Sequence, residues 1–346
     1  MGKLGCRQLI VLIAALAAAS AAHGHSVTIG VSWSNFQEER WKTDEAAMRA
    51  ALETQGARYV SADAQSSTEK QLSDIEGLMA RGADALVVLA QDADAIAPAV
   101  SAALAEGIPV IAYDRLIEQP GVFYLSFDNR EVGRIQAREI LARVPRGRFA
   151  VIKGSAQDPN SDFLHAGQLD VLGRAIEAGD VEIVGEQYVD GWLPEVAQRT
   201  MEQILTANGN RIDAVVCSND GMAGGVVAAL TAQGMEGIPV SGQDGDYAAL
   251  NRVARGTQTV SVWKDSRELG RIAAKLAVAL ANGASPEAID GRTRWRSPGG
   301  NEMDAILLSP TPITRERLER VIDAGWVPRE IVCRGVTSEP PVACTP

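Results

Sequence analysis

Histidine and cysteine are scarce in this chain, which has 346 residues with 3 His and 4 Cys. Neither type occurs in the spacing of a metal site, and the chain has no Gly-x-Ser-x-Gly nucleophile elbow or phosphate-cradling glycine loop. These absences argue against metal-dependent, serine-type and nucleotide-dependent enzymes. A pair of Asp or Glu side chains could still act as the two carboxyl groups of a glycosidase, but no motif favours that interpretation. We therefore expect a protein that is not an enzyme and needs no cofactor.

Positive charge is also in short supply. The chain has 33 Lys and Arg against 44 Asp and Glu, a formal net charge of −11. Nucleic-acid binding needs concentrated Lys and Arg, so this class of partner is not expected. A sugar-responsive transcription regulator would need a basic helix-turn-helix before residue 27, and the segment found there is of another kind.

That N-terminal segment has the pattern of a signal peptide. Lys3 and Arg7 precede an apolar run, Leu9–Ala19, which ends in small residues at Ser20-Ala21-Ala22. We predict a signal peptide over residues 1–22, cleaved near Ala22. An uncleaved anchor is the alternative, but the run is shorter than the ~20 residues that span a bilayer.

Export bears on the cysteines and on the new N-terminus. An oxidising compartment permits a disulfide between Cys333 and Cys344 in the Pro-containing tail (331–346), with two free thiols as the alternative. Cys217 ends an apolar run and is expected to be a buried hydrophobe. After cleavage, the free amine with His23 and His25 could bind copper or nickel, although a disordered terminus is the simpler reading.

Short apolar runs alternate with helix-like segments from residue 27 onward. This alternation predicts parallel sheets covered by helices on both faces, an α/β fold with doubly wound lobes. The predicted strands are Val27–Trp33, Arg58–Ala62, Ala85–Leu89, Pro109–Tyr113, Phe123–Phe127, Phe149–Lys153, Glu182–Gln187, Ala214–Ser218, Pro239–Gly242 and Thr259–Trp263.

The two halves of the chain repeat each other. Gly107-Ile108-Pro109-Val110 recurs unchanged at 237–240, and residues 84–88 are echoed by 213–217 at nearly the same offset. Two related lobes with a cleft between them follow. The offset pairs Asp114 with Asp244, each just beyond a predicted parallel strand, at the edge where such sheets bind ligands.

Clusters of polar and aromatic residues occur at several of these strand ends and helix starts. Charged side chains make strong hydrogen bonds to sugar hydroxyls, and aromatic rings suit the apolar faces of sugars. Singly, such residues could be helix caps, surface charges or core aromatics. Together they predict a ligand site made of Arg40, Trp41, Asp114, Arg115, Asp158, Asn160, Trp192, Asn219, Asp244 and Lys264.

The motifs that carry these residues resemble one family. Glu39-Arg40-Trp41, Ala112-Tyr113-Asp114-Arg115, Ser126-Phe127-Asp128-Asn129, Val189–Glu195, Ser218-Asn219-Asp220 and Gly242-Gln243-Asp244 are similar to periplasmic sugar-binding proteins of ABC transporters. The resemblance implies a type I periplasmic-binding-protein fold, with Arg40, Asp114, Arg115, Asn160, Asn219, Asp244 and Lys264 bonded to pyranose hydroxyls. It also implies that Trp41 and Trp192 enclose the ring.

The resemblance further implies a monomeric receptor in the periplasm that delivers its sugar to an inner-membrane ABC permease. Val189–Glu195 is the stretch most specific to the xylose-binding group, so D-xylose is the first expectation. Glucose, arabinose and galactose, or service to a chemoreceptor or sensor, are the alternatives.

The lobes are expected to be discontinuous in sequence. We predict an N-terminal lobe of 26–127 plus about 265–300 and a C-terminal lobe of 128–264 plus about 301–330. Three hinge segments would join them, at Ser126–Asn129, Lys264–Ser266 and Pro298–Glu302. Gly299 and Gly300 in the third segment suit backbone rotation, with a plain surface loop as an equal alternative.

Overall fold

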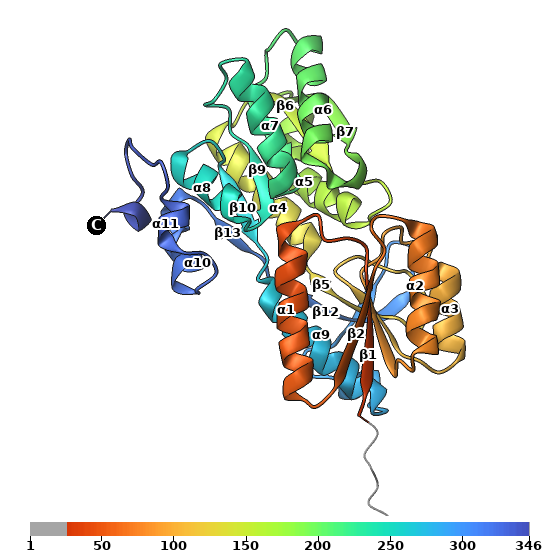
Figure 1. The fold of residues 1–346 in the computed structure, drawn as a ribbon. Coiled ribbons are helices and arrows are strands. Elements are labelled where there is room, and N and C mark those ends of the chain that lie inside the picture. The colour runs from red at the N-terminus through yellow and green to blue at the C-terminus, as the bar shows by residue number, and fades with distance from the viewer. Residues whose placement is uncertain (1–25, 346) are drawn as a thin grey trace, which may run out of the picture.

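The computed structural model describes residues 26–345, which form two lobes, each built on its own sheet (Figure 1). The predicted signal peptide, 1–22, and both His23 and His25 lie outside the described residues. Within residues 26–345, no helix has the length and apolar character that a bilayer crossing requires.

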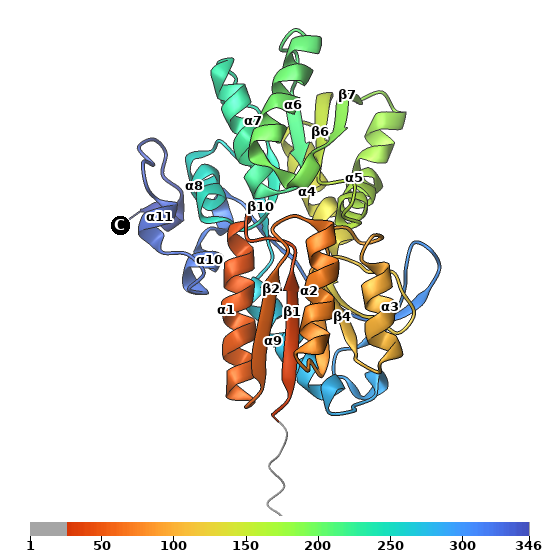
Figure 2. The same ribbon diagram turned by 45° about the vertical axis from the view of Figure 1, so that its right-hand side comes forward.

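The N-terminal lobe contains a seven-stranded sheet in the order β11-β12-β5-β4-β3-β1-β2, parallel except for the β11–β12 pair. Its strands are β1 Thr28–Trp33, β2 Arg58–Asp63, β3 Ala85–Val88, β4 Val110–Tyr113, β5 Phe123–Phe127, β11 Thr293–Arg296 and β12 Glu302–Leu308. Its helices are α1 Glu39–Thr54, α2 Thr68–Ala80, α3 Ala97–Ala105 and α9 Ser266–Ala281. Figures 1 and 2 show α1 and α9 on one face of this sheet and α2 and α3 on the other.

Both faces of this sheet are apolar, as its strand sequences predict. In β3, Val87 packs into the cluster that contains Met48 of α1, whereas its neighbour Leu86 packs with Leu78 of α2. Successive residues of a strand point to opposite faces, so a short run of consecutive apolar residues fills both cores.

The C-terminal lobe contains two three-stranded sheets, β7-β6-β8 and β13-β10-β9, joined by a bridge between Val215 and Val240. Its strands are β6 Gly147–Lys153, β7 Val181–Tyr188, β8 Ala214–Cys217, β9 Ser241–Asp244, β10 Val260–Trp263 and β13 Thr311–Ile313. Its helices are α4 Asn129–Arg143, α5 Asn160–Glu177, the 3-10 helix η1 Asp190–Trp192, α6 Pro194–Ala207, α7 Asp220–Ala232 and α8 Tyr247–Arg255.

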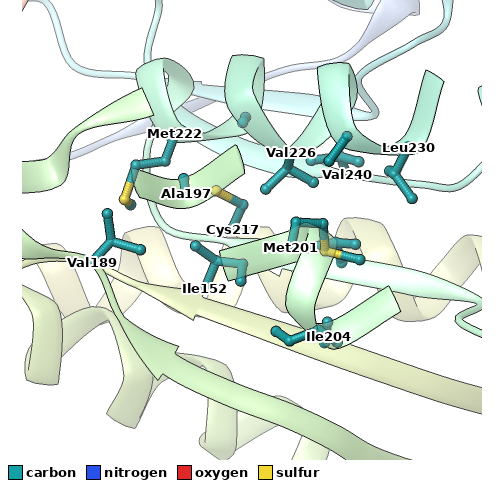
Figure 3. Close-up of a cluster of buried hydrophobic side chains, with 14 of the residues drawn as sticks. Ile152, Val189, Ala197, Met201, Ile204, Cys217, Met222, Val226, Leu230 and Val240 are labelled. Atoms are coloured by element: carbon teal, nitrogen blue, oxygen red, sulfur yellow. The ribbon is translucent and has the colours of Figure 1, made fainter. Parts of the chain in front are cut away.

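The largest core of this lobe lies between its strands and helices α6 and α7. Figure 3 shows Ile152 of β6 and Cys217 of β8 facing Met201 of α6 and Val226 of α7. Cys217 is a buried free thiol. It packs as a small hydrophobe, as its place at the end of an apolar run predicts.

Three chain crossings join the lobes, and one of the three predicted hinge segments is wrong. The chain passes from β5 to α4 and from β10 to α9 within two of those segments. The third crossing is Ser309-Pro310, between β12 and β13. Gly299-Gly300 instead forms the turn of the antiparallel β11–β12 hairpin, with Gly300 at φ +89°.

This hairpin also corrects the domain boundaries. Residues 302–308 pair with β5 in the N-terminal sheet, so they do not belong to the C-terminal lobe as predicted. The Arg-rich β11 is largely exposed at a sheet edge and shows no apolar run, which is why the sequence did not indicate a strand there.

A C-terminal cap (residues 314–345) packs on α8 at the outer side of the C-terminal lobe (Figure 1). It contains η3 Arg315–Arg317, α10 Glu319–Asp323, α11 Arg329–Val332 and η4 Val342–Cys344. A disulfide joins Cys333 to Cys344. The cap buries Leu318, Val321 and Trp326 against Leu250 and Val253 of α8.

Candidate functional site

A small cleft between the lobes brings together side chains from both. It is lined by Glu38, Arg40, Trp41, Asp114, Arg115, Asp158, Asn160, Trp192, Asn219, Gln243, Asp244 and Lys264. The structure thus places all ten residues of the predicted ligand site at one cleft and adds Glu38 and Gln243, which sequence reasoning missed.

On the N-terminal lobe, the cleft residues come from the start of α1 and the end of β4. Arg40 and Trp41 lie in the first turn of α1, preceded by Glu38 at its N-cap position. Asp114 and Arg115 directly follow β4. Asp114 has a left-handed backbone at φ +62°. Such a conformation is costly for a non-glycine residue and is concentrated at functional sites.

The C-terminal lobe provides the matching carboxylate. Asp244 ends β9, which runs two residues further along the chain than predicted, and its φ is +103°. The internal repeat therefore pairs two strand-end aspartates that share an unusual positive φ. This agreement supports a common geometric role for the two residues.

The remaining side chains of the C-terminal lobe lie at helix starts or after strands. Asn160 is the first residue of α5, Trp192 ends η1, and Lys264 follows β10. Asn219 caps α7, because its Oδ1 accepts a 2.9 Å hydrogen bond from the Met222 amide. Its Oδ1 thus has a capping role as well as a place at the cleft.

Arg40 is the centre of the charge network. Its Nη2 lies 2.9 Å from Oδ2 of Asp114, its Nη1 lies 3.2 Å from Oδ1 of Asp244, and its Nε lies 3.5 Å from Oδ2 of Asp44. Lys264 Nζ adds a 3.0 Å contact to Oδ1 of Asp244. One guanidinium therefore bridges carboxylates of both lobes.

A second group of contacts also joins the lobes. Arg115 Nε lies 2.9 Å from Oδ2 of Asp158, and its Nη1 donates to the Ala90 carbonyl at 2.9 Å. Asn160 Nδ2 donates to Oδ1 of Asp114 at 3.1 Å, and its Oδ1 accepts from Asn129. Arg115 and Asp114 belong to one lobe and Asp158 and Asn160 to the other, so the Arg115–Asp158 and Asn160–Asp114 contacts exist only when the lobes are close. The bonds to Ala90 and Asn129 each stay within one lobe.

The network divides the carboxyls in and beside the cleft into two kinds. Burial alone would raise the pKa of Asp114, but Arg40, Lys264 and Arg115 together hold that pKa below its usual value. Burial raises the pKa of Asp44 to about 6. Burial and repulsion from Asp244 raise the pKa of Glu38 to about 7. Asp114 is thus an anion that the cations stabilise, whereas Glu38 changes charge near neutral pH.

One tryptophan comes from each lobe. Trp41 is covered on one face by the Arg40 guanidinium, 4.3 Å from its ring centroid. Trp192 lies so close to Gly154 that a Cβ at position 154 would come within 2.1 Å of the ring. Gly154 therefore provides the space in which the Trp192 ring can lie at the cleft.

Several buried polar atoms of the cleft have no hydrogen-bond partner among the residues that the structure describes. They include Nε1 of Trp41, Nε1 of Trp192 and Oε1 of Gln243. Buried polar groups are normally paired, so donors and an acceptor that face a shared cleft suit a ligand with hydroxyl groups.

The cleft is nearly filled by its own side chains, with a free volume of about 10 Å³. That is roughly the space that one water molecule occupies. A larger ligand would have to part the ion pairs between the lobes and take their place. The lobes must therefore separate for such a ligand to enter.

A sequence profile of the periplasmic binding protein domain matches residues 29–285. The chain belongs to the periplasmic binding protein family. Its two lobes with mostly parallel sheets have the type I fold of this family.

Two curated relatives are D-xylose-binding periplasmic proteins. The one from Escherichia coli is 40% identical over 309 residues, covering 88% of this binding protein and 92% of the relative. The one from Haemophilus influenzae is 38% identical over 328 residues, covering 94% and 98%. Both matches extend over most of each chain.

Solved structures show the same architecture with sugars bound. An ABC transporter solute-binding protein from Clostridium phytofermentans, with bound β-D-glucose, has a TM-score of 0.80 at 29% identity, covering 88% of this chain and 99% of that one. A carbohydrate-transporter protein from Chloroflexus aurantiacus, in complex with D-glucose, has a TM-score of 0.81 at 27% identity, covering 88% and 98%.

The two missed residues each adjoin a motif that sequence reasoning used. Gln243 lies between Gly242 and Asp244, and Glu38 directly precedes Glu39-Arg40-Trp41. The signal that could have found them is this adjacency, because the end of a strand and the N-cap of a helix both face the edge at which ligands bind.

Proposed function

We propose that this binding protein captures a neutral aldopyranose, with D-xylose as the first candidate, between its lobes and delivers it to a membrane permease. The observation that carries the proposal is the Arg40 bridge, in which one buried guanidinium contacts Asp114 of one lobe and Asp244 of the other. No reaction on the sugar is part of the proposal.

The chemistry of the cleft suits hydroxyl groups. A sugar hydroxyl can donate to a carboxylate and accept from a guanidinium or ammonium at the same time. A sugar that enters between Arg40, Asp114 and Asp244 would replace charge–charge contacts with charge-assisted hydrogen bonds to both lobes. The apolar faces of the ring would meet Trp41 and Trp192.

The location and the first sugar are supported by the relatives. The Escherichia coli and Haemophilus influenzae proteins are named as periplasmic and D-xylose-binding, and their identity to this chain extends over nearly its whole length. A periplasmic location agrees with the signal-peptide pattern at residues 1–22. The glucose complexes of similar fold make D-glucose the second sugar to test.

The experiment is a calorimetric titration of the purified mature protein with D-xylose, D-glucose, L-arabinose and D-galactose. Asp114→Ala should weaken binding of the preferred sugar by about 2–4 kcal/mol, because it removes the partner of Arg40 Nη2 and of a sugar hydroxyl in a buried site. Asp74→Ala removes a carboxylate that pairs with Lys70 on the surface of α2, so it is the matched control. Wild-type affinity in Asp114→Ala, or chemical conversion of any sugar, would contradict the proposal.

A further inference from the structure

The residue behind Asp244 is held unusually firmly. Gly245 is buried and has a left-handed backbone at φ +79°. A Cβ at this position would come within 2.6 Å of Trp263 Cδ1 and 3.3 Å of Trp326 Nε1. Only glycine fits here, and the two peptide groups around it determine where the Asp244 carboxylate lies.

The N–H side of this turn is fixed from within the C-terminal lobe. The Gly245 amide donates to Oδ2 of Asp220 at 3.0 Å and to Oγ of Ser261 at 3.0 Å. The next amide, of Asp246, donates to the same Asp220 oxygen at 3.1 Å. Asp220 is therefore a buried acceptor for the turn and does not contact the cleft.

The carbonyl side is fixed from the C-terminal cap. Trp326 Nε1 donates to the Gly245 carbonyl at 2.6 Å. The indole is itself wedged in place, 5.8 Å from the Trp263 ring and edge-on to Tyr247, whose hydroxyl donates to the Trp326 carbonyl at 2.7 Å. Trp263 directly precedes Lys264, so the Trp326 ring also packs against the neighbour of a second cleft residue.

The cap also reaches the hinge. Arg267, in the first turn of α9, donates to the carbonyls of Ala324 and Gly325, each at 3.2 Å, and its guanidinium lies 5.2 Å from the Trp326 ring centroid. Helix α9 belongs to the N-terminal lobe. The segment around Trp326 thus contacts the turn after Asp244 and the first helix beyond the β10–α9 crossing.

We infer that Trp326 is a positioning residue for sugar binding: its indole N–H holds the Gly245 carbonyl and so keeps the Asp244 carboxylate at its place in the cleft. This inference rests on the proposed function. It assigns a role to the C-terminal cap beyond covering α8. The cap, closed by the Cys333–Cys344 disulfide, acts on the site from outside the cleft, since Trp326 is not among the cleft-lining residues.

The test is Trp326→Phe, which keeps an aromatic ring but removes the donor. With D-xylose in calorimetry, its dissociation constant should rise about five- to tenfold, because a carboxylate with a loosened backbone binds its hydroxyl less well. Tyr247→Phe removes the hydrogen bond to the Trp326 carbonyl but keeps the ring that packs edge-on to the indole and leaves the indole N–H in place, so it should keep wild-type affinity. Both measurements are made well below the melting temperatures.

A double-mutant cycle with Asp244→Asn separates positioning from general stabilisation. If Trp326 acts through Asp244, Trp326→Phe should change the affinity of Asp244→Asn by less than about twofold. The inference would be overturned if the fold-changes in dissociation constant of the two single variants multiply in the double variant, or if Trp326→Phe keeps wild-type affinity. If the wild-type protein binds none of the sugars, the proposed function fails instead, and the two failures are thereby distinguished.

Discussion

At the scale of single residues, two carboxyl groups in and beside the cleft have raised pKa values, so their charged forms at neutral pH lower the stability of the folded protein. Glu38 is half-buried, and its pKa is about 7 because of burial and then the nearby Asp244 carboxylate, with Arg115, Arg40 and Lys264 opposing the rise. Asp44, beneath Arg40, has a pKa of about 6 because of burial. Both values lie above the ordinary ones of 4.5 and 3.8.

The sign of the resulting pH dependence follows from proton linkage. Between about pH 4.5 and 7, the folded protein binds protons that the unfolded chain has released. Stability from these two groups is therefore complete below their ordinary pKa values and is lost as the pH rises through the folded values. Asp114 has the opposite sign, since its lowered pKa contributes stability that is lost only in acid.

We predict that the sugar-free protein melts at a lower temperature at pH 8 than at pH 5, and that Glu38→Gln reduces this difference. At pH 8 the substitution should raise the melting temperature by about 2–4 °C, since it removes a charge that burial disfavours. Calorimetric scans in buffers of equal ionic strength measure the effect. Glu39→Gln, at the exposed neighbouring position, should leave the difference unchanged. An equal response in both variants would mean that Glu38 is not the titrating group.

The cleft residues could be nominated from sequence because they share one topological rule. Asp114, Asn219 and Asp244 all lie at or just after carboxyl ends of parallel strands, and the internal repeat marks two of them. Glu38 was missed because its raised pKa comes from burial and from the charge of Asp244, which lies more than two hundred residues away in sequence. Sequence spacing contains no information about such an electrostatic neighbour.

At the scale of elements, helix α5 matters because it begins at Asn160. It packs very closely on α4, since a Cβ at Gly167 would come within 1.9 Å of the Arg130 carbonyl oxygen. At Gly133 of α4, a Cβ would come within 2.0 Å of the Leu164 carbonyl oxygen. These two glycines let the helix backbones touch, and this contact fixes the start of α5 beside the cleft.

We predict that Gly167→Ala lowers the free energy of unfolding by about 2–3 kcal/mol, because the added methyl group forces the two helices apart. Gly173→Ala is the matched control in the same helix, where a Cβ would meet nothing within 4 Å. It should be neutral or stabilise the protein by up to about 1 kcal/mol through higher helix propensity. Denaturant titrations measure both, and similar values would show that the close contact is not what position 167 requires.

The elements that sequence predicted best were the buried parallel strands. β5 was predicted with its observed bounds, and β1 and β3 within one residue at an end. β11 was missed because it carries alternating Arg residues at an exposed edge, and β13 because it has only three residues. β12 was missed although it ends in an apolar run, Ala305–Leu308. The same miss misplaced the third hinge, since Gly299-Gly300 suits a hairpin turn as well as a crossing.

At the scale of the whole molecule, the lobes meet through buried polar contacts and through one aromatic contact. In that contact, Phe163 of α5 lies edge-on to Trp295 of β11, with ring centroids 6.0 Å apart. The hydrophobic clusters that contain Val31 and Val88 belong to the first lobe, and those that contain Cys217 and Val216 to the second. Between the lobes lie Arg40–Asp244, Arg115–Asp158 and Asn160–Asp114. At the cleft, closure therefore depends on charged and polar groups that a ligand can replace.

This arrangement makes the position of the lobes sensitive to single charges. The three crossings allow rotation, and a sugar that bonds to both lobes favours the closed form. Before the sugar binds, an ion pair between Arg115 and Asp158 holds the lobes together. Its Nε and Oδ2 atoms lie 2.9 Å apart, and both side chains are almost fully buried. Loss of one partner leaves an uncompensated buried charge, which opening of the cleft would expose to water.

We therefore predict that Asp158→Asn shifts the sugar-free protein toward an open form, with a larger radius of gyration in small-angle X-ray scattering. Saturating D-xylose should return the radius to the wild-type closed value, because the proposed site keeps Asp114 in one lobe and Asp244 in the other as partners for the sugar. Asp170→Asn is the control: it breaks an exposed ion pair with Arg130 and Arg134, all three within the C-terminal lobe, and should leave the radius unchanged. A sugar-free radius in Asp158→Asn equal to that of wild type would show that the Arg115–Asp158 pair does not contribute to closure.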